Sequence, residues 1–233
     1  MRARHLLLAT VGAMLLVAGC SGNDPEPDAP APRSAADQLA AAKTVLDDAG
    51  TVALDLTSSD VPLRENGVTA AKGSGVISET EPEFEGTITG SIQGVAGTIE
   101  TIAIGETAWI KFFTPDFVET DLDTINAPNP ALFFDPSGGI SSLLTATTDP
   151  TDAGQVRSGS EVLTRIDGGL PGAQVETLFH LGDGSGDYSV SYGLTEGDEL
   201  RTASIVGPFF PDTQATYSLT LKDYGKPVEI TRP

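Results

Sequence analysis

The chain has 233 residues and is strongly acidic, with 33 Asp and Glu residues against 13 Lys and Arg residues and a formal net charge of −20. This balance argues against nucleic-acid binding, because a phosphate backbone is bound with Lys and Arg. It also argues against electrostatic docking on anionic lipid. The single cysteine excludes an intramolecular disulfide, so packing alone must stabilise the fold.

The N-terminus has the pattern of a lipoprotein signal. Two arginines precede an apolar run from Leu6 to Ala18, which is shorter than the roughly 17–25 apolar residues of a transmembrane helix. The run ends in Val17-Ala18-Gly19-Cys20 and so resembles the lipobox of bacterial lipoproteins, whose cysteine carries diacylglycerol. We predict a signal peptide at residues 1–19 and a lipid anchor on Cys20. The alternative is an ordinary secretory signal with a chance cysteine.

A spacer and a helix follow. Ser21 to Arg33 is rich in proline and acidic residues, which predicts that residues 20–33 are a lipidated cysteine and a disordered tether. Ser34 is a suitable helix N-cap, and apolar residues recur at helical spacing from Leu39 to Ala49. Gly50 is a plausible end of this helix.

Alternating patterns predict about five strands between Thr51 and Phe113. Gly94 and Gly97 are expected to flank a turn between two of them. These strands are rich in Gly, Thr and Ile, and glycine in strands marks bends and bulges. Such a sheet can curve strongly, and its own side chains need not fill the concave face.

Thr114 to Gly154 interrupts the β pattern and is too long for a plain loop. Ala131–Phe134 and Ile140–Ala146 are each long enough for a short helix. These apolar stretches either complete the core or form a mobile lid over an apolar cavity.

The β pattern resumes at Gln155–Asp167, and Pro171–Leu181 has helical spacing. Four alternating runs close the chain, at residues 188–194, 200–206, 215–221 and 228–231. This order of elements predicts an α+β fold with a long antiparallel sheet.

Three strings carry a resemblance to a known family. They are Gly105–Pro115, Asn129–Ile140 with Leu143-Leu144, and Leu219–Ile230. Placed in this order behind a lipobox and a spacer, they resemble the LprG/LppX family of mycobacterial cell-envelope lipoproteins. The resemblance implies a strongly curved antiparallel half-barrel at residues 34–233, with helices over its open side and an enclosed apolar cavity.

The resemblance also implies a function. Members bind acylated lipids and lipoglycans, such as triacylglycerol or acylated phosphatidylinositol mannosides, and carry them between the inner membrane and the outer layer. One subgroup works with a major-facilitator exporter. For this chain we expect a monomeric, extracytoplasmic carrier that is lipid-anchored to the cell membrane, without enzymatic activity or cofactor. The alternatives are an accessory or sensor subunit of an envelope transporter or kinase, and a hydrolase of envelope lipids.

Alternation and the resemblance together predict the cavity residues. From the sheet they are Ile88, Ile92, Ile102, Ile104 and Trp109, and from the lid they are Leu132, Phe133, Leu143 and Leu144. The resemblance places Ile88 at a cavity-wall position that is Val in the family. Trp109 could instead plug an end of the sheet.

Other polar motifs are better explained as structural or surface features than as metal-binding or catalytic sites. Asp183-Gly184-Ser185-Gly186-Asp187 hints at a calcium loop but lacks the closing Glu, so a tight turn is preferred. His180 has no evident partners for a metal site or a catalytic triad. Asp121 and Asp123 are expected to be solvated surface residues.

Overall fold

A computed structural model describes residues 33–62, 65–92 and 94–233, apart from the side chain of Ile92. The predicted signal peptide at residues 1–19, Cys20 and the spacer up to residue 32 lie outside the described residues. Their assignments therefore stay predictions.

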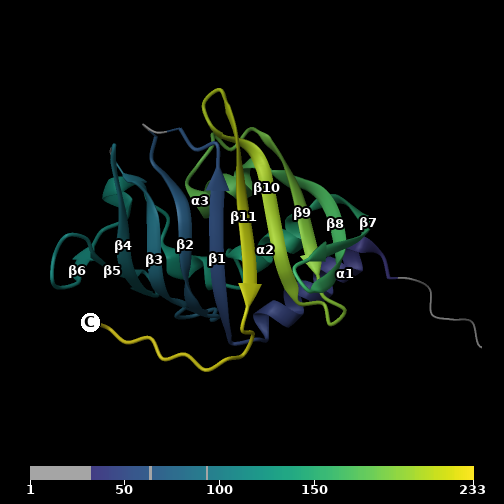
Figure 1. The fold of residues 1–233 in the computed structure, drawn as a ribbon, viewed down its shortest axis with the longest axis horizontal. Coiled ribbons are helices and arrows are strands. Elements are labelled where there is room, and N and C mark those ends of the chain that lie inside the picture. The colour runs from purple at the N-terminus through teal and green to yellow at the C-terminus, as the bar shows by residue number, and fades with distance from the viewer. Residues whose placement is uncertain (1–32, 63–64, 93) are drawn as a thin grey trace, which may run out of the picture. The chain divides into compact units, whose positions relative to one another are not determined.

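Eleven strands form one sheet, in which every pair of neighbours is antiparallel. The strands are β1 (Thr51–Ser59), β2 (Gly67–Val76), β3 (Glu83–Ile92), β4 (Val95–Ile104), β5 (Thr107–Lys111), β6 (Val118–Thr120), β7 (Thr148–Ser158), β8 (Glu161–Pro171), β9 (Asp187–Leu194), β10 (Leu200–Phe210) and β11 (Thr213–Lys222). The predicted α+β class with a curved antiparallel sheet is confirmed (Figure 1).

The strand order is β6-β5-β4-β3-β2-β1-β11-β10-β9-β8-β7. The chain therefore runs outward from the centre to β6, crosses to the opposite edge at β7, and returns to place β11 beside β1. Leu54 lies opposite Leu221, and Leu56 lies opposite Leu219, in this central pair. Two local meanders are thus joined by one pairing of the first and last strands.

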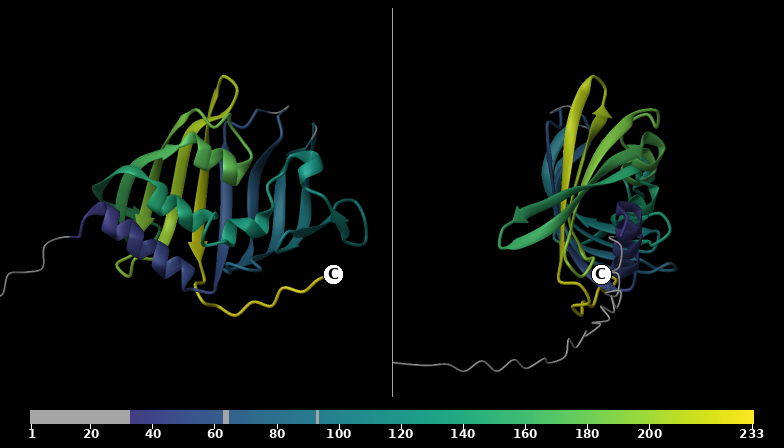
Figure 2. Two further views of the ribbon diagram at one scale, coloured as in Figure 1. Left: turned by 180° about the vertical axis from the view of Figure 1, so that it is seen from behind. Right: turned by 90° about the vertical axis from the view of Figure 1, so that its right-hand side faces the viewer.

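The helices lie on one face of the sheet, as both views in Figure 2 show. They are α1 (Ala35–Asp47), the 3₁₀ helices η1 (Asp123–Ile125) and η2 (Pro130–Phe134), α2 (Ile140–Ala146) and α3 (Gly172–Phe179). The predicted start of α1 is confirmed, since the Ser34 hydroxyl accepts a hydrogen bond of 3.1 Å from the Asp37 amide. The structure also buries Leu39, Ala42 and Leu46 of α1.

The two halves of this face are filled differently. On β9, β10 and β11 it carries bulky apolar side chains, such as Tyr192, Ile205 and Leu219, which are buried in the main core. On β2 and β3 glycine occupies several of the corresponding positions. Most of the main core therefore lies over one half of the sheet, and among the described residues only the buried Phe84 and Phe134 extend it over β2 and β3.

Three of these glycines let aromatic rings lie directly on the strands. A Cβ atom added to Gly73 or Gly86 would lie within 2.7 Å of the Phe84 ring, and one added to Gly75 would lie 2.4 Å from the Phe134 ring. The two rings stack with centroids 6.0 Å apart. Only a residue without a side chain permits so close an approach.

Two expectations about the elements need correction, and a third is made more specific. Gly97 belongs to β4, which begins at Val95, so it does not flank the turn before that strand. The pattern predicted at residues 155–167 is two strands, β7 and β8, joined by a short turn. Residues 228–231 form no strand, and instead Val228 and Ile230 pack against side chains of β4.

We expect Gly75→Ala to lower the free energy of unfolding by about 1–3 kcal/mol, because the new methyl group would overlap the buried ring of Phe134. Urea denaturation of the purified protein measures this loss. Gly138→Ala is the matched control, since a Cβ there meets no atom within 4 Å. Equal stabilities of the two variants would contradict the packing described here.

Candidate functional site

An apolar cavity of about 480 Å³ lies over the β1–β5 half of the sheet. Its volume is in the range of small-molecule binding sites. The strands contribute Leu54, Leu56, Ala71, Phe84, Ile88, Ile99 and Ile110. The segment from Phe112 to Phe134, here called the cover, contributes Phe112, Leu122, Ile125, Pro128, Phe133 and Phe134. The walls thus suit an apolar ligand.

The cavity has an exposed edge at the start of β4. Val95 lines the cavity and is 55% exposed, so the wall reaches solvent there. The Phe112 ring lies across β4 at Gly97, two residues from Val95, since a Cβ on Gly97 would be 2.6 Å from this ring. Glycine therefore again provides the space for an aromatic wall residue.

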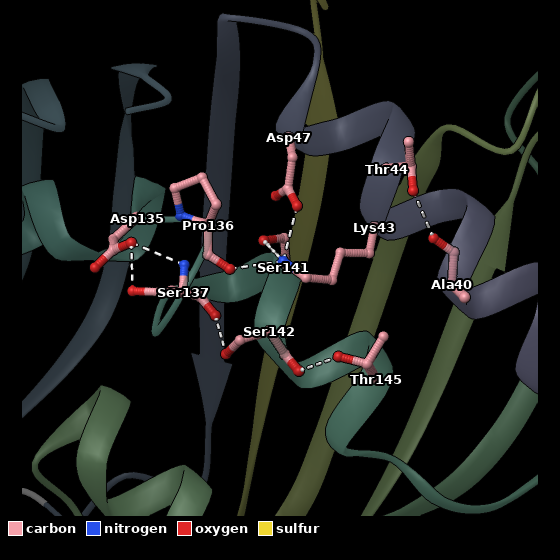
Figure 3. Close-up of polar contacts among 11 residues, drawn as sticks. Ala40, Lys43, Thr44, Asp47, Asp135, Pro136, Ser137, Ser141, Ser142 and Thr145 are labelled. Atoms are coloured by element: carbon pink, nitrogen blue, oxygen red, sulfur yellow. Dashed lines mark hydrogen bonds and ion pairs between the residues drawn. The ribbon is translucent and has the colours of Figure 1, made fainter. Parts of the chain in front are cut away.

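A lysine on α1 binds the segment that follows the cover. The Lys43 ammonium donates to the Pro136 carbonyl at 2.6 Å and to the Ser141 hydroxyl at 3.2 Å, and it pairs with Asp47 at 2.7 Å (Figure 3). Asp135 holds the turn before α2, because its carboxylate accepts hydrogen bonds of 2.8 Å from the Ser137 amide and hydroxyl. These contacts fix the segment directly after the cover against α1.

Few polar atoms face the cavity. The hydroxyls of Ser91 and Thr101 are buried and have no hydrogen-bond partner among the described residues. Burial raises the pKa of the Tyr217 hydroxyl, so this group stays neutral at ordinary pH. Among the described residues, the cavity lining therefore includes no charged side chain that could fix a ligand, and apolar contact must supply most of the binding.

The structure brings two of the predicted cavity residues together. Ile88 from β3 and Phe133 from η2 both line the cavity. The backbone of Ile92 ends β3, but its side chain lies outside the described part of the chain. Contact of these residues with a ligand stays a prediction.

Ile102, Ile104 and Trp109 lie on the opposite face of the sheet, contrary to the expectation. The two-residue connection after β3 places Ile88 opposite Ile99, and residues opposite one another share a face. Thr101 therefore faces the cavity, and its neighbour Ile102 faces outward. Ile102, Ile104 and Trp109 pack there with Val228 and Ile230.

The remaining three predictions also need correction. Leu132 is 42% exposed, because a 3₁₀ helix has three residues per turn and η2 buries Ala131 and Phe134 instead. Leu143 and Leu144 are buried in the main core. For α2, the alternative that these apolar residues complete the core is therefore correct.

The structure also identifies cavity residues that the sequence analysis missed. Ile99 and Ile110 line the cavity from β4 and β5, and Leu122 and Ile125 line it from the cover. Counting residues outward from Gln93-Gly94 as a two-residue hairpin loop would have found Ile99. The cover residues carry no such signal, since irregular backbone has no periodicity.

The polar motifs have structural roles. His180 adopts a left-handed conformation with φ 53° and ends α3. The Asp183 carboxylate accepts hydrogen bonds from the Ser185 hydroxyl and amide, which lower its pKa and form the expected turn. Within the described residues, no group of three or more His, Cys, Asp or Glu side chains is arranged to hold a metal ion.

Residues 34–230 match the family model described as LppX_LprAFG lipoprotein. The chain belongs to this family. Among solved structures, LprF from Mycobacterium bovis has a TM-score of 0.72 at 16% identity, covering 85% of this chain and 96% of that one. Lipoprotein LppX from Mycobacterium tuberculosis has a TM-score of 0.61 at 16% identity, covering 84% and 98%. These two share its fold. No curated protein matches the sequence.

The resemblance recognised in the sequence is therefore confirmed. Family membership makes this chain a lipoprotein. In the part of the chain that the structure describes, no helix is both long and apolar enough to span a membrane.

We expect Lys43→Met to lower the free energy of unfolding by about 1–2 kcal/mol, since it removes three polar contacts of a half-buried ammonium. Thermal unfolding followed by circular dichroism measures the loss. The matched control is Lys226→Met, because Lys226 is exposed and its ion pair with Asp223 is 3.9 Å long. Indistinguishable melting of both variants would argue against the anchoring role of Lys43.

Proposed function

We propose that this lipoprotein binds acylated lipid or lipoglycan through its acyl chains and carries it across the cell envelope toward the outer layer. The observation that carries the proposal is the apolar cavity of about 480 Å³ between sheet and cover. Triacylglycerol and molecules like phosphatidylinositol mannoside are the ligand class. The family resemblance supports this class.

The chemistry of the walls supports acyl-chain binding. Each CH₂ group moved out of water contributes roughly 0.8 kcal/mol, so a long chain needs a large apolar space and few polar contacts. The polar part of the ligand would remain at the exposed edge near Val95, where the wall meets solvent. Such a site would accept different head groups on similar chains.

The proposed role is binding without catalysis. His180 is the only histidine after the predicted signal peptide, and its backbone serves as the C-terminal cap of α3. A catalytic role for His180 would need a nucleophile and an orienting group beside it. Among the described residues that line the cavity, the polar side chains are hydroxyls and the amides of Asn66 and Asn126.

We further propose that Cys20 carries the lipid anchor and holds the domain on the extracytoplasmic side of the cell membrane. Two or more acyl chains anchor a protein stably where a single chain is marginal. A domain held by the predicted tether could exchange its lipid with the membrane or with a major-facilitator exporter. We propose that it acts as a monomer.

One observation favours the alternative role as an accessory subunit. Phe113 is 91% exposed and has a positive φ of 55°, which is unusual for a large residue. Its ring lies 4.2 Å from that of Phe112, a cavity residue. An exposed aromatic beside the cavity suits contact with a partner, and this contact is compatible with lipid carriage.

Ile88→Trp should abolish most lipid binding, because the larger side chain would occupy the middle of the cavity. Native mass spectrometry of protein produced in an actinobacterial host, followed by lipid extraction, measures the bound fraction. Thr87→Trp is the matched control, since Thr87 is exposed on the same strand and its side chain points to the other face. Equal lipid content in both variants would refute the cavity as the binding site.

Cys20→Ala should remove the protein's covalent acyl groups. Metabolic labelling with an alkyne analogue of palmitate, followed by fractionation, should show label on the wild-type protein only. Label of equal intensity on the variant would place the lipid on another residue and contradict the proposed anchor.

A further inference from the structure

A single layer of side chains divides the cavity from a second void on the same face of the sheet. The second void measures about 20 Å³. Leu56, Phe133, Phe179 and Tyr217 line both spaces. Because each of these residues borders both voids, no further layer of protein separates the two spaces at this point.

Most of this layer consists of three aromatic residues, here called the aromatic partition: Phe133, Phe179 and Tyr217. Phe179 ends α3, and its ring meets that of Phe133 edge to face at 5.5 Å. On its other side the Phe179 ring lies 5.5 Å from that of Tyr217 on β11. The partition thus forms where two covering elements meet the sheet.

The space beyond the partition is suited only to an apolar group. Its walls include Leu143, Ala203, Ile205 and Leu219. The one hydroxyl that points toward this region from β9, that of Tyr192, is already bonded to the Leu143 carbonyl at 3.2 Å and to Thr147 at 3.0 Å. The terminal part of an acyl chain fits this chemistry, and a polar head group does not.

We propose that the aromatic partition sets the length of acyl chain that the cavity accepts, with Phe179 as the principal specificity-determining residue. This inference rests on the proposed function. A chain that enters at the Val95 end lies over the floor of β2 to β4, and its terminal methyl group stops at the Phe179 ring. Methylenes beyond that length gain no buried surface.

The test uses the full chain in detergent and a series of saturated monoacylglycerols that differ only in chain length, with binding measured by native mass spectrometry. In the wild type, affinity should rise by up to about fourfold per added CH₂ and then stop rising. In Phe179→Ala the rise should continue to longer chains, because removal of the ring joins the two voids. A rise that stops at the same length in both proteins would overturn the proposal.

Phe209→Leu is the matched control. Phe209 is buried and contacts both Phe179 and Tyr217, at 5.8 and 4.6 Å, yet it borders neither void. This variant should weaken the same aromatic cluster and leave the limiting length unchanged, and a shift equal to that of Phe179→Ala would overturn the proposal. Phe133→Ala tests the partition again if Phe179→Ala does not fold, and it should also extend the limit.

The outcomes separate this inference from the proposed function. If the wild type binds no monoacylglycerol of any length, acyl-chain binding itself fails. If the wild type binds and all variants reach the same limit, only the role of the partition fails.

Discussion

The close approach of aromatic rings to glycine backbone on β2 and β3 is the contact on which the rest of the structure depends. Phe84 lies on Gly73 and Gly86, and Phe134 lies on Gly75. These rings form a thin floor at one end of the concave face, where Leu or Ile side chains would otherwise project into the space. Space therefore remains between the sheet and the cover.

Apart from the void of about 20 Å³, the other half of the same sheet is filled with side chains. Tyr192, Ile205 and Leu219 meet the helices there and form the main core. The pairing of β1 with β11 joins this rigid half to the half that holds the cavity. The meander of β7 to β11 thus holds most of the packed core, and the meander of β1 to β6 holds the cavity. This division lets the cavity exist without weakening the core.

An empty cavity of this size is costly. At about 24 cal/mol per Å³, a dry void of this volume would cost on the order of 10 kcal/mol, which is as much as the whole stability of many domains. Water or a ligand must therefore occupy the space. The apolar walls bind water poorly, so an acyl chain that fills the cavity would leave water and would also stabilise the folded protein.

The order of elements could be predicted because each type leaves its own period in the sequence. Ser34 and the apolar spacing after it predict α1, and alternation predicts β1 to β5. The facing of side chains could not be predicted without the exact hairpin loop, because a change of one residue moves a whole strand to its other face. Ile102 and Ile104 were assigned to the wrong face for this reason.

The cover shows a second limit of prediction. Its length and prolines identify it as a special segment, but no period tells which residue faces inward. Phe133 lines the cavity while its neighbour Leu132 is exposed, a difference that arises only from the 3₁₀ geometry of η2 and its contact with the sheet. The partition at Phe179 likewise depends on the meeting of α3 and β11, which are distant in sequence.

In the proposed function, an acyl chain occupies the space over β2, β3 and β4. The most direct measurement is a crystal structure of the protein purified with its lipid from an actinobacterial host. We expect continuous, elongated density that passes Ile88 and Phe84 and reaches toward Phe179. A cavity closed by inward movement of the cover, or filled with discrete waters, would contradict the proposed function.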